Sequence, residues 1–149
     1  MIKISFIGDI MSYESQDIAI KKNNISYDEI FEPIKKMLNT SSLVVGNLET
    51  TVAGEDASYT NDAASFNTPE EILLAIRKCG IDMVTTANNH ILDRGVKGMV
   101  KTIDNLDKYG IKHTGSYRTI DEAEHVHVEE MGGGKNSYTI LYIRNKFRV

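Results

Sequence analysis

Residues 43–49 read Leu-Val-Val-Gly-Asn-Leu-Glu, and this stretch decides the fold class. Its first three residues, Leu43-Val44-Val45, are apolar and mostly β-branched, as expected for a strand buried on both faces of a sheet. Gly46 ends the predicted strand, and Asn47-Leu48-Glu49 brings a carboxamide and a carboxylate to its carboxyl end. A buried strand that ends in polar, metal-capable side chains predicts a parallel strand with a functional site at its end.

The same pattern occurs twice more along the chain. Residues 3–7 form a predicted strand that stops at Gly8-Asp9, and residues 82–86 form another that leads into Asn88-Asn89-His90. Parallel strands expose their carboxyl ends on one side of a sheet, so residues about forty positions apart in sequence converge there. We therefore expect one site, assembled from three strand ends.

Helical patterns separate the predicted strands. Residues 30–38 have apolar residues at helical spacing (Ile30, Phe31, Ile34, Met37 and Leu38), and Pro33 predicts a kink or a late start there. A second helix opens with Thr68 as N-cap, Pro69 at the first position and Glu71 closing a capping box. Its buried face is Ile72, Leu73, Ile76 and Cys79, and Gly80 ends it.

The remaining elements complete an alternating order. Residues 95–109 form a helix with an apolar stripe of Val96, Met99, Val100, Ile103 and Leu106, and residues 111–114 form a short strand. Residues 125–129 and 138–144 flank a glycine-rich segment like the strands of a hairpin. Residues 53–67 lack any period and predict a loop that borders the site. Strand and helix alternation predicts an α/β fold with a mostly parallel sheet and flanking helices.

Length and composition set limits on function. A chain of 149 residues predicts one domain, and 17 basic against 21 acidic residues, without a basic stripe, argue against nucleic acid as a partner. No run approaches the roughly 20 apolar residues of a membrane span, so we expect a soluble, cytoplasmic chain. The single cysteine, Cys79, is expected to be a buried thiol.

The polar clusters suit metal chemistry. Asp9 and Glu49 are hard oxygen ligands for a divalent cation, whereas a lone strand-end Asp is more often only a turn cap. Asn89 offers a neutral carbonyl ligand, and His90 offers an imidazole ligand or a general acid. Asp93 either orients the His90 ring or caps the following helix. Together these residues favour a metal-assisted reaction over three unrelated polar turns.

The other histidines are weaker candidates. His125 and His127 alternate on one face of a predicted strand, a spacing that suits metal ligation, and His113 lies beside another strand. No third ligand lies near them in sequence, so we interpret all three as partly exposed strand histidines.

Four ordered motifs resemble those of the bacterial capsule-synthesis protein CapA family, also called the poly-gamma-glutamate synthesis family. They are Gly8-Asp9-Ile10-Met11, Gly46-Asn47-Leu48-Glu49-Thr50, Phe66-Asn67-Thr68-Pro69, and Ala87-Asn88-Asn89-His90 with Asp93 and Gly95. That family is similar to the calcineurin-like metallophosphoesterases, so the resemblance implies a layered α/β/β/α fold, here truncated. It also implies Asp9, Glu49, Asn89 and His90 as metal ligands, His90 and Asp93 as catalytic residues, and Mn, Mg or Zn as cofactor.

Two departures from the family pattern bear on activity. Met11, a soft thioether, stands where many metallophosphoesterases have a second histidine ligand, which predicts a weak or absent metal position. The family also has further histidine motifs beyond the point that this chain reaches. We therefore expect residues 1–134 to be the N-terminal part of a CapA-like domain, with an incomplete site.

Residues 135–149 are expected to be a frameshifted or divergent tail. They can be back-translated so that the next reading frame encodes Lys-Ile-Ala-Ile-Leu-Tyr-Tyr-Thr-Tyr-Gly-Thr-Asn-Ser-Gly, which resembles the segment that the family has at this place. Runs of Gly and Lys codons near 132–135 are prone to slippage. Without later strands, a sheet edge or apolar face would be exposed, and this favours aggregation or a homodimer formed through the exposed sheet edge.

Two functions follow from these expectations. The first is metal-assisted hydrolysis or transfer on a phosphoester or polyanionic polymer, in capsule or poly-gamma-glutamate biosynthesis. The second is a non-catalytic structural or polymer-binding remnant. We expect this chain to be inactive, and the full-length relatives implied by the resemblance to be membrane-associated or extracytoplasmic.

Overall fold

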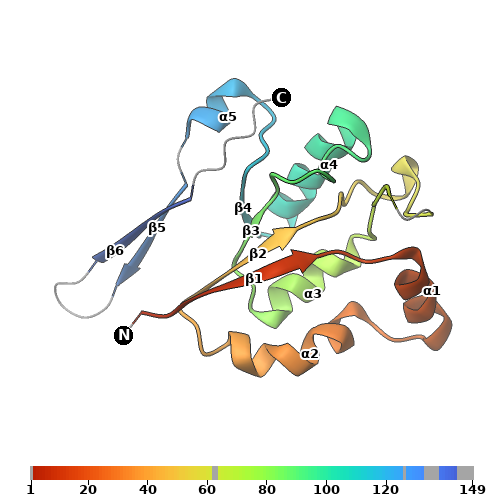
Figure 1. Cartoon of the computed structure of the whole chain (residues 1–149), viewed down its shortest axis with the longest axis horizontal. Coiled ribbons are helices and arrows are strands. Elements are labelled where there is room, and N and C mark those ends of the chain that lie inside the picture. Colours follow the sequence, from red (N-terminus) through yellow and green to blue (C-terminus); the bar gives the residue numbers. More distant parts are fainter. Residues whose placement is uncertain (1, 62–63, 126, 133–137, 144–149) are drawn as a thin grey trace.

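A four-stranded parallel sheet forms the centre of the computed structural model, which describes residues 2–61, 64–125, 127–132 and 138–143. The strands are β1 (Ile4–Ile10), β2 (Leu43–Leu48), β3 (Met83–Thr85) and β4 (Lys112–Thr114), in the order β1-β2-β3-β4 (Figure 1). Each adjacent pair is parallel. The predicted α/β class with a parallel sheet is therefore confirmed.

Helices cover one face of this sheet. Val44, Leu48 and Val84 on that face pack with residues of α2 (Tyr27–Leu38), α3 (Glu71–Cys79) and α4 (Gly95–Lys108) in one core. The helical residues in it include Leu38, Ile72, Leu73, Ile76, Cys79 and Leu106. The predicted buried face of α3 is thus confirmed, and burial raises the pKa of the Cys79 thiol.

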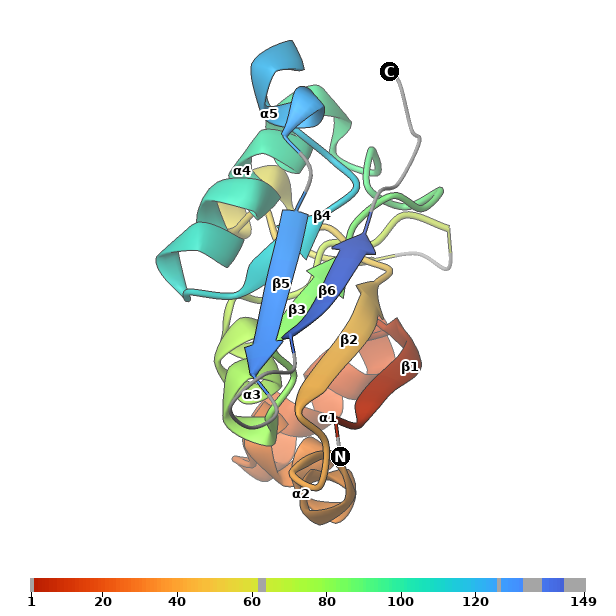
Figure 2. The ribbon, with the colours of Figure 1, turned by 90° about the vertical axis from the view of Figure 1, so that its left-hand side faces the viewer.

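A β-hairpin covers the opposite face. Leu43, Val45 and Met83 form a second, smaller core with Ile4 and with Met131 of β5 (His127–Gly132). β5 pairs antiparallel with β6 (Tyr138–Ile143), and Figure 2 shows this hairpin over β2 and β3. The predicted hairpin is confirmed, and the stacking of helices, sheet and hairpin provides the α/β/β part of the expected layered fold. Of the expected tail, residues 135–149, residues 135–137 and 144–149 lie outside the described residues.

Two short helices have no counterpart among the sequence predictions. α1 (Glu14–Asn23) buries only Asp17 and Ile20, so it shows no apolar period. α5 (Ile120–Glu124) is a single short segment capped by Thr119, whose hydroxyl accepts from the Glu122 amide. A 3-10 turn, Glu55–Ala57, lies inside the predicted loop. Local capping, rather than amphipathic spacing, defines these elements.

Two of the three predicted helix starts are corrected by the structure, whereas α4 begins at Gly95 as predicted. α2 begins after Ser26, whose amide donates to Glu29 Oε1 at 3.0 Å, and it continues through Pro33 without a break. Pro33 removes one helical hydrogen bond within α2. The capping box that Ser26 and Glu29 form stabilises the start of the helix. α3 begins at Glu71 with Glu70 as N-cap, because Thr68 instead pairs with the Thr50 hydroxyl at 3.0 Å.

The apolar stripe of α2 is only partly buried. Leu38 is buried and Phe31 packs against the core, whereas Ile30, Ile34 and Met37 are exposed. On α4, Met99, Ile103 and Leu106 are buried as predicted, but Val96 in its first turn is exposed. Among the described residues, none of the helices is both long and apolar enough to span a membrane.

Candidate metal and catalytic site

The polar side chains predicted at the three strand ends lie at one edge of the sheet. Asp9 in β1 is the register partner of Asn47 in β2, and Asn47 is the partner of Thr85 in β3. β1 and β2 are longer than predicted, so Asp9 and Asn47 lie within the last residues of their strands. The parallel register therefore brings together residues that are 38 positions apart in the chain.

Asn47 is the centre of this cluster. Its Nδ2 donates to Asp9 Oδ1 at 2.9 Å and to Glu49 Oε2. Its Oδ1 accepts from Thr85 Oγ1 at 3.2 Å and from Asn88 Nδ2 at 3.1 Å. One carboxamide thus holds two carboxylates on one side and the segment after β3 on the other.

Asn88 connects the carboxylates to His90. Its Nδ2 also donates to the Leu48 carbonyl at 2.8 Å, and its Oδ1 accepts from the His90 amide at 3.0 Å. Asn89, the predicted ligand, is exposed and has no hydrogen bond among those found in the described part of the chain. Asn47 and Asn88 are site residues without a predicted role. Their position beside Glu49 and His90 in the quoted motifs was the available signal.

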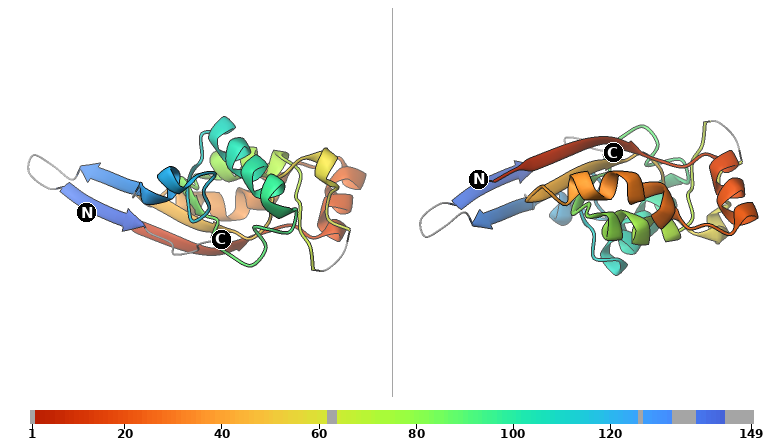
Figure 3. Two further views of the ribbon diagram at one scale, coloured as in Figure 1. Left: turned by 90° about the horizontal axis from the view of Figure 1, so that it is seen from above. Right: turned by 90° about the horizontal axis from the view of Figure 1, so that it is seen from below.

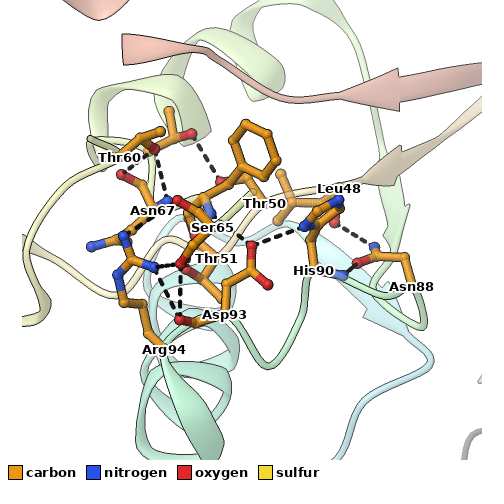
Figure 4. A network of polar contacts seen from close by, with 12 residues as sticks. Leu48, Thr50, Thr51, Thr60, Ser65, Asn67, Asn88, His90, Asp93 and Arg94 are labelled. Carbon is orange, nitrogen blue, oxygen red and sulfur yellow. Dashed lines mark hydrogen bonds and ion pairs between the residues drawn. The ribbon is translucent and has the colours of Figure 1, made fainter. Parts of the chain in front are cut away.

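His90 is held by a carboxylate and an aromatic ring (Figure 4). Its Nδ1 lies 2.9 Å from Asp93 Oδ2, and its ring packs edge-to-face with the Phe66 ring, with centroids 4.7 Å apart. A carboxylate only accepts, so Nδ1 carries a proton that it donates to Asp93. Of the two roles predicted for Asp93, the contact to His90 is the one present, and Arg94 stands at the N-cap of α4.

The loop before α3 is hydrogen-bonded to Asp93 and Arg94, next to His90. The Phe66 amide donates to Asp93 Oδ2 at 2.6 Å, and Arg94 donates to the Ser65 hydroxyl and, through Nε, to the Ser58 carbonyl at 3.0 Å. Figure 4 shows Asp93 and Arg94 on the side of Ser65 and Asn67. The predicted loop therefore borders the site, and it positions the ring that packs on His90.

The residues present fit part of a cation site. Asp9 and Glu49 supply two carboxylates beside one amide, and Mg²⁺ binds through one or two carboxylates while it keeps several waters. Within the described ranges, no three His, Cys, Asp or Glu side chains come together in a group that could hold a metal. This edge thus supplies hard oxygen donors for part of a coordination shell.

The remaining histidines lie elsewhere. His113 Nε2 is 3.0 Å from Asp107 Oδ1, His127 Nε2 is 2.6 Å from Glu129 Oε1, and His125 Nδ1 is 2.6 Å from the Asp121 carbonyl. All three line an open cavity of about 390 Å³ near α5 that none of Asp9, Glu49 and His90 lines. Each of these histidines contacts a carboxylate or a backbone carbonyl outside the candidate site.

Comparison with known proteins places this chain in a family. The model of the bacterial capsule synthesis protein PGA_cap family matches residues 3–143. The capsule biosynthesis protein CapA of Bacillus anthracis is 24% identical over 135 residues, covering 89% of this chain and 32% of the relative.

Two further relatives agree with that match. The PGA biosynthesis protein CapA of Bacillus subtilis is 24% identical over 125 residues, or 83% of this chain and 32% of the relative. The uncharacterized protein y4sH of Sinorhizobium fredii is 30% identical over 118 residues, or 70% of this chain and 24% of the relative. The chain spans about a third of the length of the two CapA relatives. Because the family model covers nearly the whole chain, this chain belongs to the bacterial capsule synthesis protein PGA_cap family.

Proposed function

We propose that this chain supplies the Asp9, Glu49 and His90 part of a metal-assisted hydrolase or transferase site in capsule or poly-gamma-glutamate biosynthesis. The substrate class is a phosphoester or another polyanionic group. The observation that carries the proposal is the continuous hydrogen-bonded path from the two carboxylates through the Asn47 and Asn88 side chains to the backbone amide of His90. This path holds cation ligands and a proton donor at one edge.

The site residues have separate proposed roles in cation binding and proton transfer. Asp9 and Glu49 would hold a divalent cation (Mg, Mn or Zn), with Asn89 as a further proposed ligand and His90 as either a ligand through Nε2 or the general acid, and Asn47 keeps the two carboxylates together. When bound, such a cation supplies Lewis acidity and lowers the pKa of a coordinated water. As a general acid, His90 would react as the imidazolium: Nδ1–H stays donated to Asp93, and the second proton, on Nε2, passes to the leaving group and leaves neutral imidazole.

A second candidate is a non-catalytic polymer-binding role. The observation that favours it is that the described residues form no group of three His, Cys, Asp or Glu side chains suited to a metal. Two carboxylates bind a hydrated cation weakly, and such a cation would bridge to a polyanion without turnover. On this second candidate, cation binding without hydrolysis is expected.

Mn²⁺ titration tests the shared part of both candidates. Free Mn²⁺ is followed by electron paramagnetic resonance in the wild-type chain, in Asp9→Asn and in Glu49→Gln. We expect each substitution to weaken binding by about tenfold or more, because it removes a charged ligand. Glu124→Gln is the matched control, since Glu124 is an exposed carboxylate on α5. Absence of Mn²⁺ binding, or equal binding in all four proteins, would contradict the proposed site.

A turnover assay separates the two candidates. A chromogenic phosphodiester is incubated with the Mn²⁺-loaded chain and with His90→Gln. Hydrolysis that falls about 10²-fold or more in His90→Gln at unchanged Mn²⁺ affinity supports catalysis with His90 as general acid. Mn²⁺ binding without hydrolysis supports the non-catalytic role.

A further inference from the structure

Asp17 is a buried carboxylate in the first turn of α1, outside the cluster that Asn47 joins. It is 8% exposed, and α1 lies beyond the carboxyl end of β1, at the end of the molecule opposite the β5-β6 hairpin (Figures 1 and 3). Its Oδ1 accepts two short hydrogen bonds, from Ser12 Oγ and from Tyr27 Oη, each at 2.5 Å. Its Oδ2 is buried and has no hydrogen-bond partner among the residues that the structure describes.

The two bonds to Oδ1 are of the strong kind. A hydroxyl binds an ionised carboxylate at a shorter distance, and roughly twice as strongly, as it binds a neutral acceptor. Both partners of Asp17 are uncharged, so within the described ranges the N-terminal turn of α1 is what offsets its charge. Burying a carboxylate with one bare oxygen still costs stability. The side chain is therefore better explained by the two segments that it holds together than by a net gain in stability.

The first of these segments carries the candidate cation ligands. Asp9 lies three residues before Ser12, and the Ile10 carbonyl accepts from the Glu49 amide at 3.0 Å. Ser12 itself is buried, with 3% of its surface exposed. The short stretch from Asp9 to Ser12 thus carries one carboxylate and holds the backbone of the other.

The second segment is the start of α2, where Tyr27 is fixed in the core. Tyr27 is 6% exposed and packs with the residues that cover the helical face of the sheet. Burial, and after it the hydrogen bond to Asp17, raises the pKa of Tyr27, so the phenol keeps its proton and donates it to Asp17. Because both hydroxyls meet at Oδ1, Asp17 joins the stretch after β1 to this core.

We propose that Asp17 is a positioning residue for the Asp9 and Glu49 cation site. Asp17 fixes Ser12, and Ser12 fixes the backbone that leads from Asp9 past the Ile10 carbonyl, so the two carboxylates stay together as one site. Loss of this connection lets Asp9 move relative to Glu49 and weakens cation binding without removing a ligand. The inference rests on the proposed function, and it adds a residue that does not touch the cation.

Mn²⁺ titration followed by electron paramagnetic resonance tests this role in the full chain. Asp17→Ala and Ser12→Ala are each expected to weaken Mn²⁺ binding by about threefold or more, although Ser12→Ala changes no charge. The double variant is expected to bind no more weakly than the weaker single variant, because both changes break the same bond. Asp82→Ala is the matched control, since this carboxylate accepts from the Val44 amide at 2.8 Å at the opposite end of the sheet.

Circular dichroism and thermal melting confirm that each variant is folded at the temperature of the titration. Tyr27→Phe, which removes only the second hydroxyl, replaces Asp17→Ala if that variant does not fold. Variants that melt earlier but bind Mn²⁺ as the wild type does overturn the inference, and a weakened Asp9→Asn in the same series leaves the cation site standing. Losses that multiply in the double variant, or an equal loss in Asp82→Ala, also overturn it. A wild-type chain that binds no Mn²⁺ overturns both proposals.

Discussion

Replacing Asn67 by Ala tests how the loop beside the site is held. The Asn67 side chain is fully buried, and its hydrogen bonds within the described part of the chain go to backbone groups of Ala53, Gly54 and Ser58. Its Oδ1 accepts from the Ala53 amide at 2.7 Å, and its Nδ2 donates to the carbonyls of Gly54 at 2.9 Å and Ser58 at 3.0 Å. One side chain therefore closes a loop of the candidate site.

The expected loss can be worked from these three contacts. Ala53 is buried, so its amide stays without a partner in Asn67→Ala, at a cost of about 1–3 kcal/mol. Gly54 is partly exposed and Ser58 is exposed, so their carbonyls regain water, and each bond lost there costs about 0.5–1 kcal/mol. Together the free energy of unfolding is expected to fall by about 3 kcal/mol.

Urea denaturation followed by circular dichroism measures this loss. We expect a lower midpoint at an unchanged slope, because the surface exposed on unfolding is the same. Asn89→Ala is the matched control, since it removes an exposed amide and should change stability by no more than about 0.5 kcal/mol. A decrease below about 1 kcal/mol in Asn67→Ala would refute the assignment of these bonds as the fastening of the loop.

Three further outcomes are expected. Leu73→Ala removes a fully buried side chain between α3 and the sheet and should lower the free energy of unfolding by about 2–5 kcal/mol in the same urea assay. Burial alone would raise the pKa of Glu129, but hydrogen bonds from Lys112 and His127 outweigh it, so the folded-state pKa is lowered. The hydrogen bonds of Glu129 with Lys112 and His127 therefore stabilise the fold above the unfolded-state pKa of a glutamate, about 4.3, and this stabilisation is lost as the pH falls through the folded-state pKa of Glu129. Glu129→Gln should therefore reduce the decrease of melting temperature at acid pH. Sequencing the gene across codons 132–149 should show the Tyr-Thr-Tyr-Gly-Thr-Asn segment in the next reading frame, and a different peptide there would exclude the frameshift.

Most of the sheet could be predicted from sequence because its signals are local. The segment Leu43-Val44-Val45 is apolar, and a strand that is buried on both faces of a sheet requires that composition. The buried face of α3 and the β5-β6 hairpin were predicted correctly for the same reason. α1 was missed because it buries too few apolar residues to show a period. The start of α3 was wrong because Thr68 is used in a contact with Thr50, which is distant in sequence.

The candidate site was predictable in its members but not in its connections. Asp9, Glu49, His90 and Asp93 stand out as carboxylates and a histidine after apolar strands, and the parallel register brings Asp9 and Asn47 side by side. The roles of Asn47 and Asn88 could not be read from the chain, because an asparagine after a strand has the same appearance whether it caps a turn or joins two carboxylates.

The sequence by itself determined the class of fold, the order of its elements and the edge of the sheet where polar side chains gather, since each depends on residue type and spacing. Only the tertiary structure decided which asparagine joins the cluster, which carboxylate orients His90, and which apolar residues of α2 stay exposed. These outcomes depend on strand register and on the packing of distant segments, and no local pattern encodes either.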